Sequence, residues 1–185
     1  MKIAFVLGEF PVVSQTFILN QIVGLLDRGH DVVIHADRPA EEEAVHADVH
    51  KYRLLERTRY RPKLREGKVA RLLTAAAVLA TRYPVHRKPL SEVIRFIRAL
   101  SVRTVMPRAQ ILFGGTTFLD RERYDVAHCH FGPFGLVAVA ARRAGLIDCP
   151  VITSFHGYDA NVLPRILGDD CYRPLFKTGE WFTTS

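Results

Sequence analysis

The chain has 185 residues, 48% of them hydrophobic and 24% charged, which is ordinary for one globular domain with its own core. Three widely spaced cysteines with no C-x-x-C pair argue against a disulfide framework or a zinc site and favour a reducing compartment. The first apolar run is too short for a signal peptide, and no run approaches the roughly 20 residues of a membrane span. We therefore expect a cytoplasmic protein.

The first 36 residues have the pattern of a β-α-β unit. Residues 2–7 form a continuous apolar run of strand length, as in a strand buried on both faces. A loop over 8–13 precedes a segment with apolar residues at helical spacing, which Gly29 ends in the usual stop position. Residues 31–36 predict a second strand, parallel to the first.

The middle of the chain is basic and less regular. Residues 51–108 contain 16 Lys and Arg and three acids, a local charge of +13, and the remaining ten basic and 16 acidic residues give −6, so the net charge is +7. Two helices are expected here, at about 66–83 and 91–105, with prolines at their edges. Any basic surface should therefore lie in this segment.

Basic side chains surround an apolar run in this segment. Arg65, Lys68 and Arg71 precede or flank residues 72–80, and this combination suits an anionic inner membrane leaflet. We expect peripheral docking at the inner face of the cell membrane; a solvated helix face is the alternative. Nucleic acid is disfavoured as a partner because no recognised reading motif accompanies the charge.

Strand and helix patterns alternate again towards the C-terminus. The expected elements are a strand at 125–131, a turn at Gly132-Pro133, a helix at 134–144, a strand at 150–155 and a last strand at 180–185 where its exit loop begins. Alternation of this kind predicts an α/β fold with a mainly parallel sheet.

Ligands of open parallel sheets bind outside the carboxyl ends of the strands. The rule selects loops at 8–16, 130–134 and 156–159. In the first, Gly8 would let the backbone approach a ligand, and Ser14 and Thr16 stand at a helix start, which favours an anion such as phosphate. A cap without a ligand is the alternative for Ser14. No G-x-G-x-x-G or P-loop motif supports an ordinary dinucleotide or P-loop site.

Histidines mark the other two loops. His128 and His130 alternate along a strand and so point to one face; without a third ligand we expect no metal, and His130 is the better binding candidate. His156 and Asp159 flank Gly157 at a strand end, where His156 could bind a hydroxyl or a phosphate and Asp159 could orient it. The alternative is that Asp159 caps the next helix and His156 fills space.

Three stretches together resemble a known family, and they lie at 8–18, 125–132 and 154–159. The chain resembles the N-terminal domain of family 4 glycosyltransferases, which have the two-Rossmann GT-B fold, and it looks closest to an exopolysaccharide branch that includes colanic acid transferases. The resemblance implies that residues 1–185 form a Rossmann-like acceptor-side domain with helices on both faces of the sheet.

The resemblance also implies an activity. Members transfer a sugar with retention from a nucleotide-sugar, their co-substrate, to a lipid-linked or saccharide acceptor in surface polysaccharide synthesis, without a metal or other cofactor. By resemblance, Gly8 lies beside the donor diphosphate, His156 reaches the transferred sugar and Asp159 supports that loop, so we take His156 and Asp159 as the catalytic candidates. His130 and Gly132 would line the acceptor side.

The chain departs from the family in two ways. Gln15 stands where the branch usually has Glu, and an amide can hydrogen-bond an acceptor but cannot take its proton. The family's second domain, which holds most of the donor site, is absent from these 185 residues, so we expect the chain to be inactive alone. It would be half of a truncated or shortened enzyme, or alternatively a non-catalytic membrane-docking subunit that recruits a separate donor domain.

Overall fold

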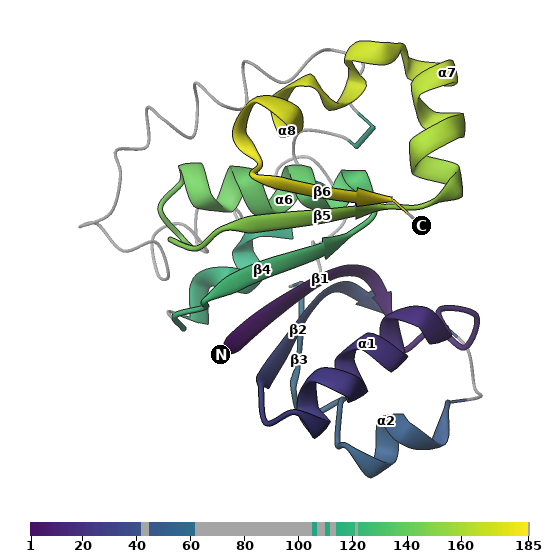
Figure 1. Cartoon of the computed structure of the whole chain (residues 1–185), viewed down its shortest axis with the longest axis vertical. Helices are drawn as coiled ribbons and strands as arrows, with labels where there is room; N and C mark the ends of the chain where they lie inside the picture. The colour runs from purple at the N-terminus through teal and green to yellow at the C-terminus, as the bar shows by residue number, and fades with distance from the viewer. Residues whose placement is uncertain (42–44, 62–104, 107–109, 112–113, 121, 185) are drawn as a thin grey trace, which may run out of the picture.

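In the part of the chain that the structure describes, six parallel strands form a sheet in the order β3-β2-β1-β4-β5-β6 (Figure 1). The computed structural model describes residues 1–41, 45–61, 105–106, 110–111, 114–120 and 122–184. The strands are β1 (Lys2–Phe10), β2 (Asp31–Pro39), β3 (Thr58–Tyr60), β4 (Val126–His130), β5 (Val151–Phe155) and β6 (Trp181–Thr184). The predicted α/β, Rossmann-like fold with a mainly parallel sheet is confirmed.

Helices cover both faces of this sheet, as predicted, with α1 and α2 on one face and α6 and α8 on the other (Figure 1). The helical elements are α1 (Thr16–Asp27), α2 (Ala47–Lys51), η1 (Gly115–Asp120), α6 (Gly132–Arg143), η2 (Tyr158–Val162), α7 (Leu163–Leu167), η3 (Asp169–Tyr172) and α8 (Arg173–Thr178). Among the described residues, no helix has both the length and the apolar character to span a bilayer.

The alternation of side chains along β1 divides the core between the two faces. Phe5 and Leu7 pack into the cluster beneath α1, whereas Ala4 and Val6 join the cluster beneath α6. All four are at most 3% exposed, so β1 is buried on both faces, as its continuous apolar run predicts.

Three predicted boundaries are wrong. β2 continues to Pro39 instead of ending at residue 36. β1 continues to Phe10 instead of ending at Leu7, because its ladder with β2 runs on through the pair Glu9 and Arg38, whose side chains also form an ion pair. Gly8 therefore lies in a strand and not in a loop. The predicted Gly-Pro turn is the first turn of α6: Pro133 needs no N–H partner at that position, so the helix begins at Gly132.

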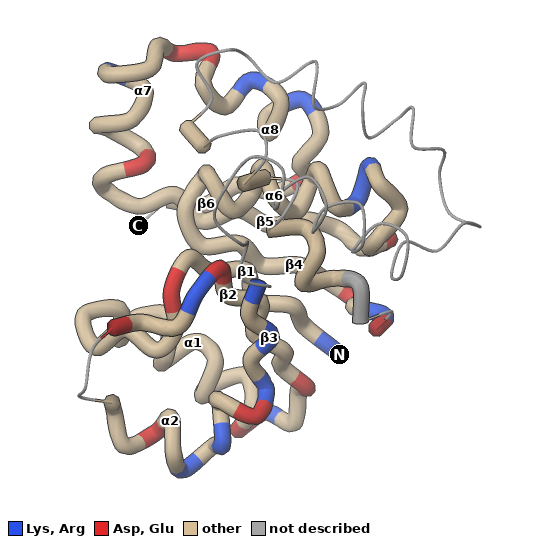
Figure 2. Tube along the Cα trace, turned by 180° about the vertical axis from the view of Figure 1, so that it is seen from behind, with Lys and Arg blue, Asp and Glu red and all other residues tan. Residues whose placement is uncertain are grey.

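The described part of the basic segment is largely neutralised by acids from elsewhere in the chain. Arg57 and Arg61 make ion pairs of 2.9 and 2.8 Å with Asp31 and Asp37. Figure 2 accordingly shows basic residues near β3 interspersed with acidic ones. The docking candidates Arg65, Lys68 and Arg71, and the two helices expected at 66–83 and 91–105, lie almost wholly outside the described residues.

Candidate functional site

The carboxyl ends of β1, β4 and β5 lie at one edge of the sheet, where α1 and η2 begin (Figure 1). These strands are neighbours in the sheet, so the loops that follow them come together, although the loop after β1 lies more than 100 residues before the other two in the sequence. The backbone N–H of Phe131 donates to the carbonyl of Ser154 at 2.8 Å and extends the contact between β4 and β5 into the loops. The predicted meeting of the β4 and β5 loops therefore has a direct backbone link.

Asp159 joins the loops after β4 and β5. One carboxylate oxygen accepts from the backbone N–H of Gly132 at 2.6 Å, and the other accepts from the backbone N–H of His156 at 2.7 Å. The side chain is 1% exposed and belongs to η2, a π-helical turn that directly follows the β5 loop. Asp159 therefore fixes the distance between α6 and the His156 loop, and its buried carboxylate is satisfied by these two donors.

The imidazole of His156 lies among aromatic rings at the strand ends. Its centroid is 4.7 Å from that of Phe17 and 4.6 Å from that of Phe131, and its Nε2 is 3.2 Å from Nδ1 of His130. Burial lowers the pKa of His156, and the nearby Asp159 carboxylate opposes that effect in part. A partly exposed, neutral imidazole at this edge can exchange hydrogen bonds with a bound ligand at neutral pH.

His130 lies directly beneath His156. It is fully buried, with its ring stacked against Phe5 at a centroid distance of 5.6 Å, and burial lowers its pKa to about 3. The side chain was expected to line the acceptor side; the structure instead places it under the surface, where it can influence a ligand through His156. Gly132, expected on the same side, is also buried.

His128 points to the same face of the sheet as His130, as the alternation along β4 predicts, and their ring centroids are 4.5 Å apart. Its Nε2 is hydrogen-bonded to Oγ of Ser154 at 2.8 Å, and this hydroxyl is in turn 2.7 Å from Oγ1 of Thr183. Burial lowers the pKa of His128 to about 4. In the described ranges, no three His, Cys, Asp or Glu residues are grouped to hold a metal ion.

Two of the expected glycines are required by close packing. A Cβ on Gly8 would lie 2.7 Å from Cζ of Phe134, so this glycine lets α6 approach β1. A Cβ on Gly132 would lie 2.5 Å from the rings of both Phe155 and Tyr172. Gly157 differs, because no described atom comes within 4 Å of the corresponding position, and the space beside its backbone is open.

The expected helix cap in the first loop is absent. α1 begins at Thr16 with Gln15 as its N-cap residue, and no side chain of the described residues caps it. The carbonyl of Gln15 accepts from the N–H groups of Ile18 and Leu19, which places Ser14 before the cap and Thr16 inside the helix. Ser14 and Thr16 are both exposed at this edge, so their hydroxyls remain accessible.

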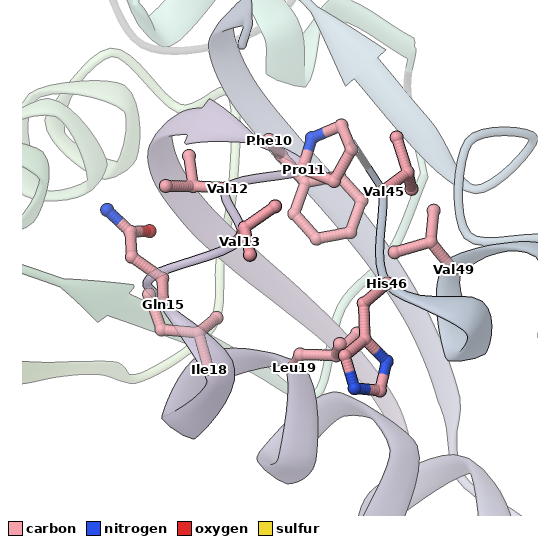
Figure 3. Close-up of a pocket in the computed structure, with 10 residues that line it drawn as sticks. All are labelled: Phe10, Pro11, Val12, Val13, Gln15, Ile18, Leu19, Val45, His46 and Val49. Atoms are coloured by element: carbon pink, nitrogen blue, oxygen red, sulfur yellow. The ribbon is translucent and has the colours of Figure 1, made fainter. Parts of the chain in front are cut away.

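An apolar cavity lies on the α1 side of the first loop (Figure 3). It is a small hollow, and the space of about 320 Å³ around it includes open solvent. Its lining is Phe10, Pro11, Val12, Val13, Gln15, Ile18, Leu19, Val45, His46 and Val49. Gln15 is the one predicted site residue in this lining, and it lies between the cavity and the start of α1. The cavity was not predicted, although the apolar run after Phe10 is a signal for it.

Phe17 and Phe131 were also missed as site residues. Phe17 follows the β1 loop and is 40% exposed, while Phe131 has φ 71° and ψ 137°, a backbone conformation that a bulky L-residue rarely adopts. Strained residues of this kind cluster at functional sites. A phenylalanine does not indicate a positive φ, so the sequence gives no signal for this backbone conformation.

Comparison with known proteins places this chain in a family. The family described as "Glycosyl transferase 4-like domain" matches residues 14–182. The putative colanic acid biosynthesis glycosyltransferase WcaL of Escherichia coli K12 is 35% identical over 184 residues, which cover 97% of this chain and 43% of the relative. Its counterpart in Salmonella typhimurium LT2 is 32% identical over the same shares of both chains.

A third relative also comes from exopolysaccharide biosynthesis. The amylovoran biosynthesis glycosyltransferase AmsK of Erwinia amylovora is 31% identical over 160 residues, which cover 86% of this chain and 38% of the relative. No solved structure matches the chain. The chain thus spans less than half the length of the curated relatives it matches. By its sequence and its parallel sheet, the chain belongs to the family of glycosyl transferase 4-like domains.

Proposed function

We propose that this chain is the N-terminal, acceptor-binding half of a retaining glycosyltransferase of surface polysaccharide synthesis. The reaction moves a sugar from a nucleotide-sugar to a lipid-linked or saccharide acceptor, with no cofactor besides that co-substrate. The observation that carries the proposal is the cluster at the carboxyl edge, where buried Asp159 holds the backbone of His156 and buried His130 contacts its partly exposed ring. The relatives' names support the class of reaction.

In this proposal His156 is the catalytic residue that contacts the reacting sugar. A neutral imidazole can hydrogen-bond a sugar hydroxyl or a phosphate oxygen, and the lowered pKa of His156 keeps the ring neutral at physiological pH. Asp159 acts through its backbone bonds to Gly132 and His156 and is a positioning residue, because both of its oxygens accept from the chain itself. Gly157 leaves open space for a ligand next to the ring.

The first loop provides the other side of the proposed site. Ser14 and Thr16 expose hydroxyls near the start of α1, where the helix dipole favours a phosphate group. Gly8 brings β1 close to α6, beside the proposed position of the donor diphosphate. Gln15 lies at the start of α1 beside the apolar cavity, and its amide can hydrogen-bond an acceptor.

A transfer assay tests this proposal. The full-length gene product and this chain alone are incubated with a panel of nucleotide-sugars and lipid-linked saccharide acceptors, and the anomeric configuration of the product is read by NMR. We expect transfer with retention by the full-length product and none by this chain alone. Inversion contradicts the retaining mechanism, and transfer by the isolated chain contradicts its role as an acceptor-binding half.

The local charge of +13 in residues 51–108 favours a second candidate function, docking at the cytoplasmic face of an anionic membrane. In that case the chain would be a non-catalytic subunit that recruits a separately encoded donor domain. Sedimentation with anionic and with neutral vesicles tests docking, and Arg65, Lys68 and Arg71 changed together to Gln give the matched variant. We expect salt-sensitive recovery with anionic vesicles that the variant loses. Equal, salt-independent recovery with both vesicle types contradicts docking.

A further inference from the structure

One apolar side chain of α1 lies on the polar face of that helix. The buried residues of α1 are Ile18, Leu19 and Ile22, and the opposite face has polar side chains at the exposed positions 16, 20 and 21. Phe17 belongs to this polar face and is 40% exposed. A single exposed apolar side chain is normal on a protein surface, so the surroundings of Phe17 decide whether it has a function.

The ring of Phe17 lies against the two histidines of the site. Its centroid is 4.7 Å from that of His156 and 6.0 Å from that of His130. The ring of Phe131 also contacts His156, at a centroid distance of 4.6 Å, so these three rings form one group at the strand ends. His130 is fully buried, whereas part of Phe17 is open to solvent. The exposed part of Phe17 therefore extends the site and is not an isolated apolar side chain.

Polar groups accompany this exposed ring. Ser14 and Thr16 precede Phe17 at the start of α1, and both are exposed. On the far side of His156, the space next to the backbone of Gly157 is open. Ligand sites typically combine an apolar, often aromatic surface with a few polar groups that fix the orientation of the ligand. A pyranose ring has the matching composition, because its C–H groups can lie together on one face while its hydroxyls lie around its rim.

We propose that Phe17 binds the sugar ring of the acceptor, with the C–H face of that sugar against the phenylalanine ring. The inference rests on the proposed function for the identity of the ligand as an acceptor. We assign the acceptor sugar, and not the donor sugar, because Gln15, the proposed acceptor contact, is two residues before Phe17. The positively polarised C–H groups of the sugar then meet the negative face of the aromatic ring. Phe17 thereby favours acceptors whose ring has one face free of axial oxygens.

Saturation-transfer NMR tests this contact on the chain itself, without a donor. Methyl β-galactopyranoside is the main probe, because one face of its ring carries only hydrogens. Methyl α-mannopyranoside is the matched probe, because an axial oxygen projects from each of its faces. On saturation of the aromatic protons, we expect transfer to the galactoside protons H3, H4 and H5 and weaker transfer to the mannoside. Equal transfer to the two glycosides overturns the stacking arrangement.

Variants separate the ring of Phe17 from its apolar packing against His130. Phe17→Leu keeps an apolar side chain there but removes the ring, whereas Phe17→Tyr keeps the ring. Trp181→Ala is the matched control, because Trp181 is another exposed aromatic residue, on β6 at the far edge of the sheet. We expect only Phe17→Leu to lose the transfer, with folding checked by urea denaturation. Wild-type transfer in folded Phe17→Leu, or an equal loss in Trp181→Ala, overturns the proposal.

Kinetics of the full-length gene product distinguish the acceptor from the donor. An aromatic contact made equally to the bound acceptor and to the transition state predicts that Phe17→Leu raises the KM for the acceptor by roughly three- to tenfold with kcat little changed. The KM for the nucleotide-sugar should stay at the wild-type value. A rise in that KM alone would place the donor's base or sugar on Phe17 and overturns the assignment.

The two experiments also separate this inference from the proposed function. If the galactoside contact depends on Phe17 but the full-length product transfers no sugar, the saccharide site stands and the proposed function fails. If transfer occurs and the acceptor KM of Phe17→Leu equals that of the wild type, the proposed function stands and the inference is overturned.

Discussion

Replacing Asp159 with Asn removes the charge that joins the two loops of the site and leaves the size of the side chain unchanged. In the wild type, one oxygen accepts from Gly132 and the other from His156, at 2.6 and 2.7 Å. The amide keeps one acceptor oxygen, but its NH₂ group must face the second backbone N–H. Two donors then meet in a site that is 1% exposed, where water cannot satisfy them.

The magnitude follows from these two bonds. A hydrogen bond to a charged group contributes about 1.5–3 kcal/mol, and a buried donor left unsatisfied costs about 1–3 kcal/mol. Since these ranges describe overlapping effects, we expect Asp159→Asn to lower the free energy of unfolding by about 3 kcal/mol. Folded domains typically have 5–15 kcal/mol in total, so the variant should still fold at room temperature.

Urea denaturation and amide hydrogen exchange measure this effect. The matched control is Asp170→Asn, because Asp170 has a 70% exposed side chain paired with Arg173 and should change stability by less than about 0.5 kcal/mol. In the Asp159 variant, exchange should speed up at the amides of Gly132 and His156. A loss below about 1 kcal/mol, with unchanged exchange at both amides, would refute the role of Asp159 in joining the loops.

Three further predictions concern stability. Gly132→Ala should lower the free energy of unfolding by about 1–3 kcal/mol in urea denaturation, because the added Cβ would lie 2.5 Å from two rings. Gly157→Ala should leave stability unchanged or raise it slightly. Equal losses of stability in the two variants would contradict the packing reason. His35 and His130 have folded pKa values of about 3, below the roughly 6.5 of an unfolded histidine, so the unfolded chain takes up their protons first as pH falls. Unfolding free energy should therefore fall below pH 6.5 by up to about 1.4 kcal/mol per pH unit for each residue, and His35→Gln should reduce that slope; an unchanged slope would exclude His35 as a cause. A double-mutant cycle on the exposed pair of Glu9 and Arg38 should give a coupling below about 1 kcal/mol, and a larger value would show a desolvated pair.

The alternation of strand and helix patterns along the chain was sufficient to predict the fold class. The apolar run at 2–7 is typical of a strand buried on both faces, and that is what β1 is. The end of β1 could not be predicted, because Gly8 and Glu9 look like loop residues and belong to the strand through their ladder with β2. The start of α6 was wrong for a similar reason, since a Gly-Pro pair fits both a turn and a first helical turn.

The site was predicted at the level of loops but not of contacts. Strand ends alone indicated that His156 and Asp159 lie near the β4 loop, and the sheet order confirms that the two loops are neighbours. The bond from Gly132 to Asp159 could not be foreseen, because it spans 27 residues and depends on the register between β4 and β5. The burial of His130 could not be foreseen either, because it depends on tertiary contacts such as the one with the ring of Phe17 on α1.

Steady-state transfer by the full-length gene product tests the role of His156 most directly. His156→Ala is compared with the wild type and with His50→Ala, a control on the exposed surface of α2. Folding of each variant is checked by urea denaturation. We expect His156→Ala to lower kcat/KM by about a hundredfold or more, while His50→Ala stays at the wild-type value. A folded His156→Ala variant with wild-type kcat/KM would contradict it.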